Sequence, residues 1–307
     1  MLLACLSVAY KGLGQTYNFT HYSVEDGLAQ NQILSLYQDS KGYIWFGTNL
    51  GGVSVFDGNK FETINETNGL PSNVVFSVIE DDKHRMLFAT NGGLGILDGE
   101  EFRNYDKEDG LGHDRVFKVF QDSKKNIWIG SHVGIYQLIN DSIVAFDLDT
   151  NLSKLPVFQV YEDSKNNIWF CTIMGGIFKY DGKEIIRYTK KEGLLHDFAK
   201  SVVEDSEGNI WIGTLGGFNI LTTDGIMIEK RITHNDSVLT VNSAAKDVDG
   251  TLWFGTESGL IRYKNNSFTK YGVENGANSV KVLTTLVDDE NNLWLGSNGK
   301  GASKLNY

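Results

Sequence analysis

The chain has 307 residues and a formal net charge of −11, with 41% hydrophobic and 12% aromatic residues. This acidic balance argues against nucleic acid as a partner, because nucleic-acid binding needs a basic surface, and it disfavours adhesion to anionic membranes. The two cysteines, Cys5 and Cys171, provide neither a disulfide framework nor a metal-binding spacing, and we expect Cys171 to be a buried free thiol.

Residues 1–15 differ in composition from the rest of the chain. They begin with a short apolar run and then become polar, which is typical of the end of a secretion signal. We interpret them as a signal peptide remnant whose start is missing, with cleavage near Gly14, and therefore expect a periplasmic or otherwise exported protein. Residues 2–5 also resemble a lipoprotein signal, which leaves open whether Cys5 is lipidated. The run is too short to span a membrane, and the sequence predicts no span elsewhere.

From residue 16 onward, one pattern returns seven times at intervals of 41 or 42 residues. Each copy is marked by a Trp or Leu, with an Asp six residues before the mark and a Thr or Ser three residues after it. The marks are Trp45, Leu87, Trp128, Trp169, Trp211, Trp253 and Trp294. Repeats of this length decide the fold and must be interpreted before other features.

The first repeat shows the plan of each unit. We expect strands at residues 33–38, 43–47, 52–56 and 61–64, with a tight hairpin around Asp57-Gly58, because both residues of such a turn need positive φ. Helical periodicity is absent throughout. Four short strands in each of seven units predict an all-β fold, a seven-bladed β-propeller of four-stranded blades whose first strands line the axis.

The two ends of the chain are expected to close the ring. An apolar pair spaced three residues apart marks the fourth strand of most repeats, and it also occurs before the first repeat as Phe19 and Tyr22. The last repeat stops after its third strand. We therefore predict that residues 16–23 complete the last blade and that residues 16–307 form a single propeller without a gap.

The repeated residues are expected to serve the scaffold. Seven equivalent catalytic acids around a ring are implausible, so we predict that each Asp accepts backbone N–H groups of its own turn. We predict that the tryptophans pack between blades. A Gly follows two residues after the mark in five copies, where backbones are expected to approach closely; Ala89 and Cys171 replace it in the other two.

Function is expected where the repeats differ, on the face that carries the loops from strand four to strand one and from strand two to strand three. The candidate ligand-binding residues are Asn31, Asn49, Asn73, His113, Arg115, His132, Met174, His196, Asp197, Glu257 and Lys300. Three histidines around an axis can hold a metal ion. These three come from blades three and five, which are not neighbours, and have no evident carboxylate partner. We therefore predict no metal, no cofactor and no catalytic residue.

The unit also resembles a known family. Its pattern is N-x-I, then D-x5-W-[IF]-G-T and G, then F-x-x-Y and D-G-L. It is read at Asn31, Asp39, Trp45 to Thr48, Gly51, Phe102, Tyr105 and Asp109 to Leu111. This resembles the two-component regulator propeller repeat over about residues 16–307. In that family such propellers form the periplasmic sensor of membrane histidine kinases, often hybrid kinases and often linked to polysaccharide sensing. A β-sandwich, a membrane helix and kinase modules usually follow, and we expect those modules to lie outside this chain.

The resemblance implies an extracytoplasmic ligand-sensing or interaction propeller of a two-component receptor, either a fragment or a stand-alone relative. It would bind a small molecule or an oligosaccharide at the loop face around the axis, without enzyme activity. Two alternatives stay open. One is a propeller lyase or hydrolase acting on a glycan or cyclic peptide. The other is a protein-interaction scaffold.

Overall fold

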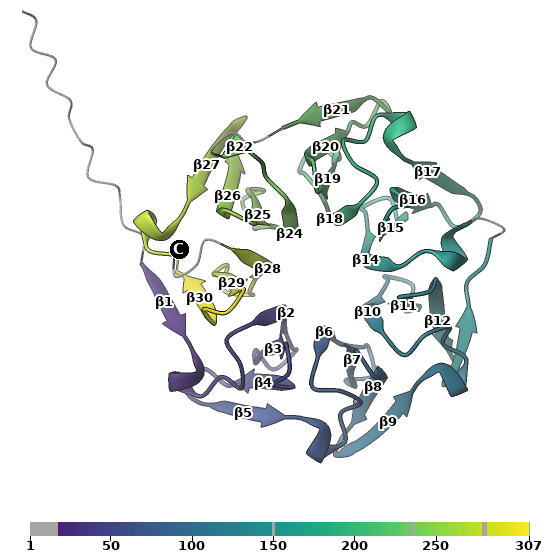
Figure 1. Ribbon diagram of the computed structural model, residues 1–307, viewed down its shortest axis with the longest axis vertical. Helices are drawn as coiled ribbons and strands as arrows, with labels where there is room; N and C mark the ends of the chain where they lie inside the picture. Colours follow the sequence, from purple (N-terminus) through teal and green to yellow (C-terminus); the bar gives the residue numbers. More distant parts are fainter. Residues whose placement is uncertain (1–17, 149–150, 232, 235–236, 278–280, 307) are drawn as a thin grey trace, which may run out of the picture.

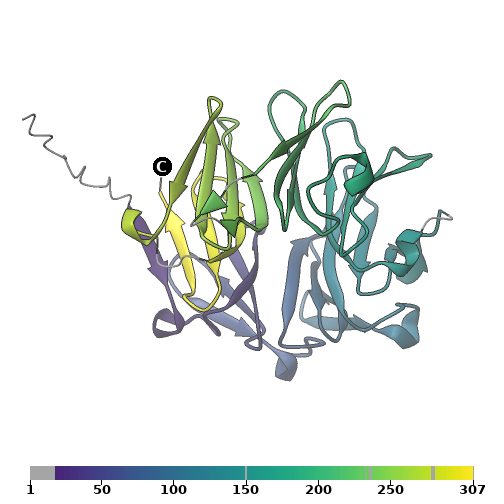
Figure 2. The same cartoon turned by 45° about the horizontal axis from the view of Figure 1, so that its top comes forward.

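The computed structural model describes residues 18–306 except 149–150, 232, 235–236 and 278–280. Seven four-stranded antiparallel sheets stand around a common axis (Figure 1). Figure 2 shows from an inclined direction that the blades stand side by side, with the short connector helices at the outer edge of the ring. The predicted seven-bladed all-β propeller is confirmed.

The strands are given blade by blade, from the axis outward. The first four blades are β2 (Ile33–Gln38), β3 (Ile44–Thr48), β4 (Val53–Phe56), β5 (Phe61–Ile64); β6 (Val75–Glu80), β7 (Met86–Thr90), β8 (Gly93–Asp98), β9 (Glu101–Tyr105); β10 (Val116–Gln121), β11 (Ile127–Ser131), β12 (Ile135–Ile139), β13 (Ser142–Ala145); and β14 (Val157–Glu162), β15 (Ile168–Thr172), β16 (Ile177–Tyr180), β17 (Ile185–Tyr188). The last three are β18 (Ala199–Glu204), β19 (Ile210–Thr214), β20 (Gly217–Leu221), β21 (Met227–Lys230); β24 (Val241–Lys246), β25 (Leu252–Thr256), β26 (Gly259–Lys264), β27 (Ser267–Tyr271); and β28 (Val282–Val287), β29 (Leu293–Ser297), β30 (Ala302–Leu305), β1 (Phe19–Tyr22).

The connectors between blades contain the remaining elements. These are the 3-10 helices η1 (Val24–Asp26), η2 (Glu66–Asn68), η3 (Lys107–Asp109), η4 (Asn151–Lys154), η5 (Lys190–Glu192) and η6 (Val273–Asn275), and a small hairpin of β22 (Thr233–His234) and β23 (Ser237–Val238). The D-G-L motif at η1 and η3, and its variants N-G-L at η2 and E-G-L at η5, are explained by these helices. In each of them, the Gly ends the helix in the left-handed region, as Gly27 does with φ 108°, and the Leu is buried.

The ring is closed by β1, the outermost strand of the last blade. It pairs antiparallel with β30, and the register places Phe19 opposite Leu305 and Tyr22 opposite Ala302. The Tyr22 ring also lies 5.5 Å from the Trp294 ring and 5.1 Å from the Phe56 ring of the first blade. The predicted closure is confirmed. The interpretation of residues 1–15 as a signal remnant, with its question about Cys5, concerns residues outside those described.

Each repeated tryptophan is held by the repeated aspartate of its own blade. In six blades the indole Nε1–H donates to the carboxylate Oδ2 across 2.8 to 3.0 Å. The other oxygen, Oδ1, accepts two backbone N–H groups of the turn; for Asp163 these come from Lys165 and Asn167, at 3.0 and 2.9 Å. The predicted turn-binding role of the Asp is confirmed. The bond to the indole is an addition that sequence reasoning missed.

The tryptophans pack against the next blade, as predicted. The ring of Trp45 lies 5.9 Å from Phe88 and that of Trp128 lies 5.5 Å from Phe170. Blade two lacks the indole because Leu87 stands at its position. There the Arg85 Nε–H donates to Asp81 Oδ2 at 2.8 Å, so a guanidinium satisfies the buried carboxylate instead.

The repeated Gly also has the predicted role. A Cβ at Gly130 would meet the Val157 carbonyl oxygen of the next blade at 2.8 Å. Cys171 occupies the same position in blade four and is fully buried, which raises the pKa of its thiol far above the usual range. It is the buried free thiol that the sequence predicts.

We expect Asp163→Ala to lower the free energy of unfolding by about 3 kcal/mol, because it leaves the buried indole N–H of Trp169 and turn N–H groups without acceptors. Urea denaturation measures this change. The matched control is Asp181→Ala. Asp181 accepts the N–H groups of Lys183 and Glu184 in an exposed hairpin, where water can replace it, so a loss below about 1 kcal/mol is expected. Equal losses in the two variants would contradict the assigned role of the indole bond.

Candidate functional site

The connectors and the loops from strand two to strand three share one face, which we call the connector face. Backbone hydrogen bonds join them: Asn49 N–H donates to the Gln32 carbonyl of its own blade's connector, and Gly52 N–H donates to the Asn73 carbonyl of the next one. The inner strands β2, β6, β10, β14, β18, β24 and β28 begin at this face and converge on the axis (Figure 1).

Several predicted ligand-binding residues hold the connectors in shape. The side-chain Oδ1 atoms of Asn31, Asn73 and Asp197 each accept the backbone N–H of the residue seven positions earlier, at 3.0, 3.0 and 2.7 Å. In the same way, Nδ1 of His113 and Nδ1 of His196 accept the N–H two residues later, both at 2.9 Å. The contacts recur from blade to blade, so they are part of the scaffold.

The structure brings together three members of the predicted set, His113, Arg115 and His132. The two imidazole rings lie 4.8 Å apart, and Arg115 Nε–H donates to Asn91 Oδ1 at 2.7 Å. Nδ1 of His132 is buried without a hydrogen-bond partner. Burial, reinforced by His113 and Arg115, lowers the pKa of His132 and favours its neutral form. Among the described residues, no group of three His, Cys, Asp or Glu side chains is arranged to hold a metal ion.

The other predicted residues are distributed around the ring. Glu257 forms an ion pair with Lys281 at 2.7 Å, and Asn49 Nδ2–H donates to Gln32 Oε1 at 2.8 Å. Met174 is 70% exposed in its loop, and Lys300 is exposed in the last one. These four residues lie in loops of blades one, four, six and seven, whereas His113 and His132 belong to blade three.

A cavity of about 400 Å³ lies among the inner strands of all seven blades. Each inner strand has a β-bulge at its second residue, which re-aims a side chain. These seven bulge residues all line the cavity, and they are of four kinds: Phe in three blades, Leu in two, and Lys and Asn in one each. They are Leu34, Phe76, Phe117, Phe158, Lys200, Asn242 and Leu283.

The bulge residues divide the cavity wall into two arcs. On one side, the ring of Phe117 lies 5.4 Å from Phe76 and 5.2 Å from Phe158, which makes a continuous aromatic arc. On the other side, Lys200 Nζ donates to Asn242 Oδ1 at 2.6 Å. Phe117 also lies 6.0 Å from His132, so the histidine pair adjoins the aromatic arc.

Lys118 departs most from its counterparts in the other blades. At the same place on the inner strand, the other blades have Ser35, Ser77, Gln159, Ser201, Ser243 and Thr284. Lys118 lines the cavity, makes no hydrogen bond or ion pair with any described residue, and burial lowers its pKa to about 8. Sequence reasoning missed this residue and the bulge residues because it sought differences only in loops. The signal was a Lys where four other repeats have Ser.

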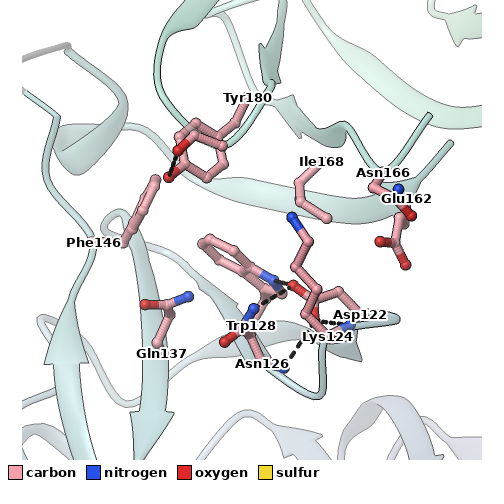
Figure 3. Close-up of a pocket in the computed structure, with 11 residues that line it drawn as sticks. Asp122, Lys124, Asn126, Trp128, Gln137, Phe146, Glu162, Asn166, Ile168 and Tyr180 are labelled. Carbon is pink, nitrogen blue, oxygen red and sulfur yellow. Dashed lines mark hydrogen bonds between the residues drawn. The ribbon is translucent and has the colours of Figure 1, made fainter.

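Further grooves lie between neighbouring blades. One of them, shown in Figure 3, lies between blades three and four and has a volume of about 260 Å³. In this groove Asp122 accepts a hydrogen bond from Trp128 of its own blade. Glu162 and Tyr180 line it from the next blade. A groove of about 680 Å³ between blades five and six contains the equivalent Asp205 and Trp211. These grooves repeat the scaffold residues, whereas the axial cavity is lined by residues that vary. We therefore take the axial cavity as the candidate site.

The family comparison supports the resemblance read from the sequence. Residues 27–50 and 193–216 match the model of the two component regulator propeller family. Both segments begin at the Gly of a connector, Gly27 or Gly193, and run through the first two strands of a blade. The chain thus contains two-component regulator propeller repeats, and the predicted resemblance is confirmed. A search of curated proteins found no match.

Solved structures share the fold. The extracellular domain of a protein described as the hybrid two component system BT3049 of B. thetaiotaomicron has a TM-score of 0.79 and 21% identity. The match covers 94% of this chain and 42% of that one, so the chain spans about two fifths of its length. Virginiamycin B lyase from Staphylococcus aureus, solved with quinupristin, matches with a TM-score of 0.77 and 14% identity, over 95% of this chain and 99% of the lyase.

A third neighbour is PorZ, a surface component of the type-IX secretion system of Porphyromonas gingivalis. It has a TM-score of 0.74 and 17% identity, over 91% of this chain and 47% of PorZ. At these identities the comparisons establish the propeller fold. Within the described part of this chain, no helix has the length and apolar character needed to cross a membrane.

We expect Lys118→Ser to raise the free energy of unfolding at pH 7 by about 1–3 kcal/mol, because it removes a half-buried charge that has no partner in the cavity. The pKa of Lys118 is lowered from 10.5 to about 8, so between these values the unfolded chain binds more protons than the folded one. Stability therefore rises with pH across this window, and the penalty is complete only below pH 8.

Urea denaturation at pH 7 and at pH 10.5 measures the difference. The gain should be largest at pH 7 and shrink at pH 10.5. Lys183→Ser, on an exposed hairpin, is the control and should change stability little at either pH. A Lys118→Ser variant that is less stable than the parent chain at pH 7 would contradict the prediction.

Proposed function

We propose that this chain is an extracytoplasmic sensor propeller of a two-component system, which binds a small molecule or an oligosaccharide in the axial cavity and at the connector face around it. One observation carries the proposal. The Asp and Trp that build the blades recur around the ring, whereas the seven bulge residues that line the cavity are unevenly distributed, with Phe in three consecutive blades and Lys200 and Asn242 on the other side. An asymmetric lining in a symmetric scaffold is suited to recognising one ligand in one orientation.

The comparisons support the signalling context. The chain contains two-component regulator propeller repeats, and its structural neighbours include extracellular domains of proteins described as hybrid two component systems. This chain spans about two fifths of those extracellular domains. In a receptor of that kind, membrane and kinase modules would lie outside the extracellular domain. An exported location agrees with the signal-like residues 1–15.

Ligand binding would be transmitted through the packing of the blades. A molecule that contacts inner strands on both sides of the axis ties together blades that otherwise touch only their neighbours. This bridging contact changes how blades pack or how two propellers dimerise, and a kinase module responds to that change.

A second candidate is a lyase or hydrolase acting on a glycan or cyclic peptide. It is favoured by His132, whose imidazole is held neutral beside His113 at the edge of the aromatic arc. A neutral imidazole near pH 7 can act as a general base. The virginiamycin B lyase propeller matches almost the whole of both chains, although at 14% identity that likeness concerns the fold.

Thermal unfolding of the protein against a panel of oligosaccharides and small metabolites tests the sensor proposal. A ligand at 100 times its dissociation constant should stabilise the fold by about 2.7 kcal/mol. Phe158→Leu should weaken that ligand about tenfold by removing part of the aromatic arc. This change is mild for the fold because Leu34 and Leu283 occupy the same bulge position. Phe268→Leu, on the outer strand β27, is the matched control and should leave binding unchanged.

The ligand recovered after the experiment separates the two candidates. Intact ligand supports a sensor, whereas consumed ligand, with turnover lost in His132→Ala, supports the enzyme. Absence of any shift across the panel would contradict both and favour a protein-interaction scaffold.

A further inference from the structure

We propose that the axial cavity is specific for an organic anion, a carboxylate on an apolar ring. Its carboxylate contacts the Lys118 ammonium, and its ring lies against the arc of Phe76, Phe117 and Phe158. The inference rests on the proposed function of the cavity and names the class of ligand.

The charge of the cavity opposes that of the chain. The protein has 39 acidic and 28 basic residues, yet two lysines and no Asp or Glu belong to the cavity lining among the described residues. A cavity that is lined by two lysines and no carboxylate, in an acidic protein, attracts an anion and repels a cation.

The two lysines of the cavity differ in their hydrogen-bond and charge partners. Lys200 donates to Asn242, and its charge is also close to that of Glu257, which forms an ion pair with Lys281. Lys118 is half-buried in the cavity wall and has no hydrogen-bond or ion-pair partner among the described residues. An ammonium kept without a counter-charge in an enclosed site has its full hydrogen-bonding capacity available for a ligand.

The repeat shows that a lysine is not needed for folding at this position. Ser35, Ser77, Ser201 and Ser243 occupy the equivalent places in four other blades. The same burial that lowers the pKa of Lys118 also lowers the stability of the folded state while the amine is charged. Lys118 thus lowers stability at a position where Ser would be compatible with the fold, and this indicates a role in binding.

The aromatic arc supplies the second half of the specificity. Phe76, Phe117 and Phe158 belong to consecutive inner strands, and Lys118 follows Phe117 directly on β10. One ligand can therefore reach the ammonium and the arc together. A volume of about 400 Å³ is in the range of small-molecule sites and accommodates a ring system of moderate size.

Isothermal titration calorimetry with 2-naphthoate and its neutral isostere 2-naphthamide tests the inference at pH 7. Naphthoate should bind at least about tenfold more tightly than naphthamide. Lys118→Ser should remove that advantage and leave naphthamide binding unchanged. Gln159→Ser is the matched control, because it also introduces a Ser, at the equivalent place of the next blade, and leaves the charge unchanged. This variant should keep the preference for naphthoate over naphthamide.

A second measurement is made on the unaltered protein. Acetylation of Lys118, followed by peptide mass spectrometry, should slow about tenfold with saturating naphthoate and stay unchanged with naphthamide. Lys183 on its exposed hairpin serves as the internal control and should react equally in both cases.

Each contrary result has a distinct meaning. Equal affinity for naphthoate and naphthamide would overturn the anion preference while leaving ligand binding in the cavity intact. Sulfate binding as tight as naphthoate would overturn the role of the aromatic arc. No naphthoate binding at about 10 mM would overturn the inference. The oligosaccharide and metabolite panel would still decide the proposed function.

Discussion

The bond between the repeated carboxylate and the repeated indole is the interaction on which the rest of the structure depends. Oδ1 of the Asp fixes the turn between the first and second strands, and Oδ2 orients the Trp that packs on the next blade, as Asp163 and Trp169 show. One buried side chain thus sets both the register within a blade and the contact between blades. Blade two confirms that the requirement is a donor for the carboxylate, because Arg85 replaces the indole.

Because the Asp and Trp hold the scaffold, other positions of the repeat are free to vary. The scaffold is held by residues at the turn end of the inner strands, and the bulges lie at the opposite end, next to the connectors. Side chains such as Lys200 and Lys118 can therefore differ from their counterparts in other blades without altering the ring. The half-buried charge of Lys118, which opposes folding, is tolerated because seven blades and a closing strand support each other.

The propeller and its closure could be predicted because they depend on local patterns repeated many times. The spacing of the tryptophans indicated the blade count, and Phe19 with Tyr22 indicated the closing strand. The candidate loop residues Asn31 and Asp197 lie in connectors, as the sequence predicts. Each of them, however, uses a side-chain oxygen to close its own connector. That contact spans seven residues in a particular turn geometry, which a list of variable loop residues does not reveal.

The sequence by itself determined the fold, the blade number, the closing strand and the structural roles of Asp and Trp, since each follows from a periodic pattern that specifies a periodic structure. Only the tertiary structure decided which variable residues meet. Phe76, Phe117 and Phe158 lie about 40 residues apart in the chain and become neighbours only when consecutive blades bring their inner strands together. Lys118 became a candidate once the cavity showed no carboxylate among its described lining residues, a fact of packing across seven blades.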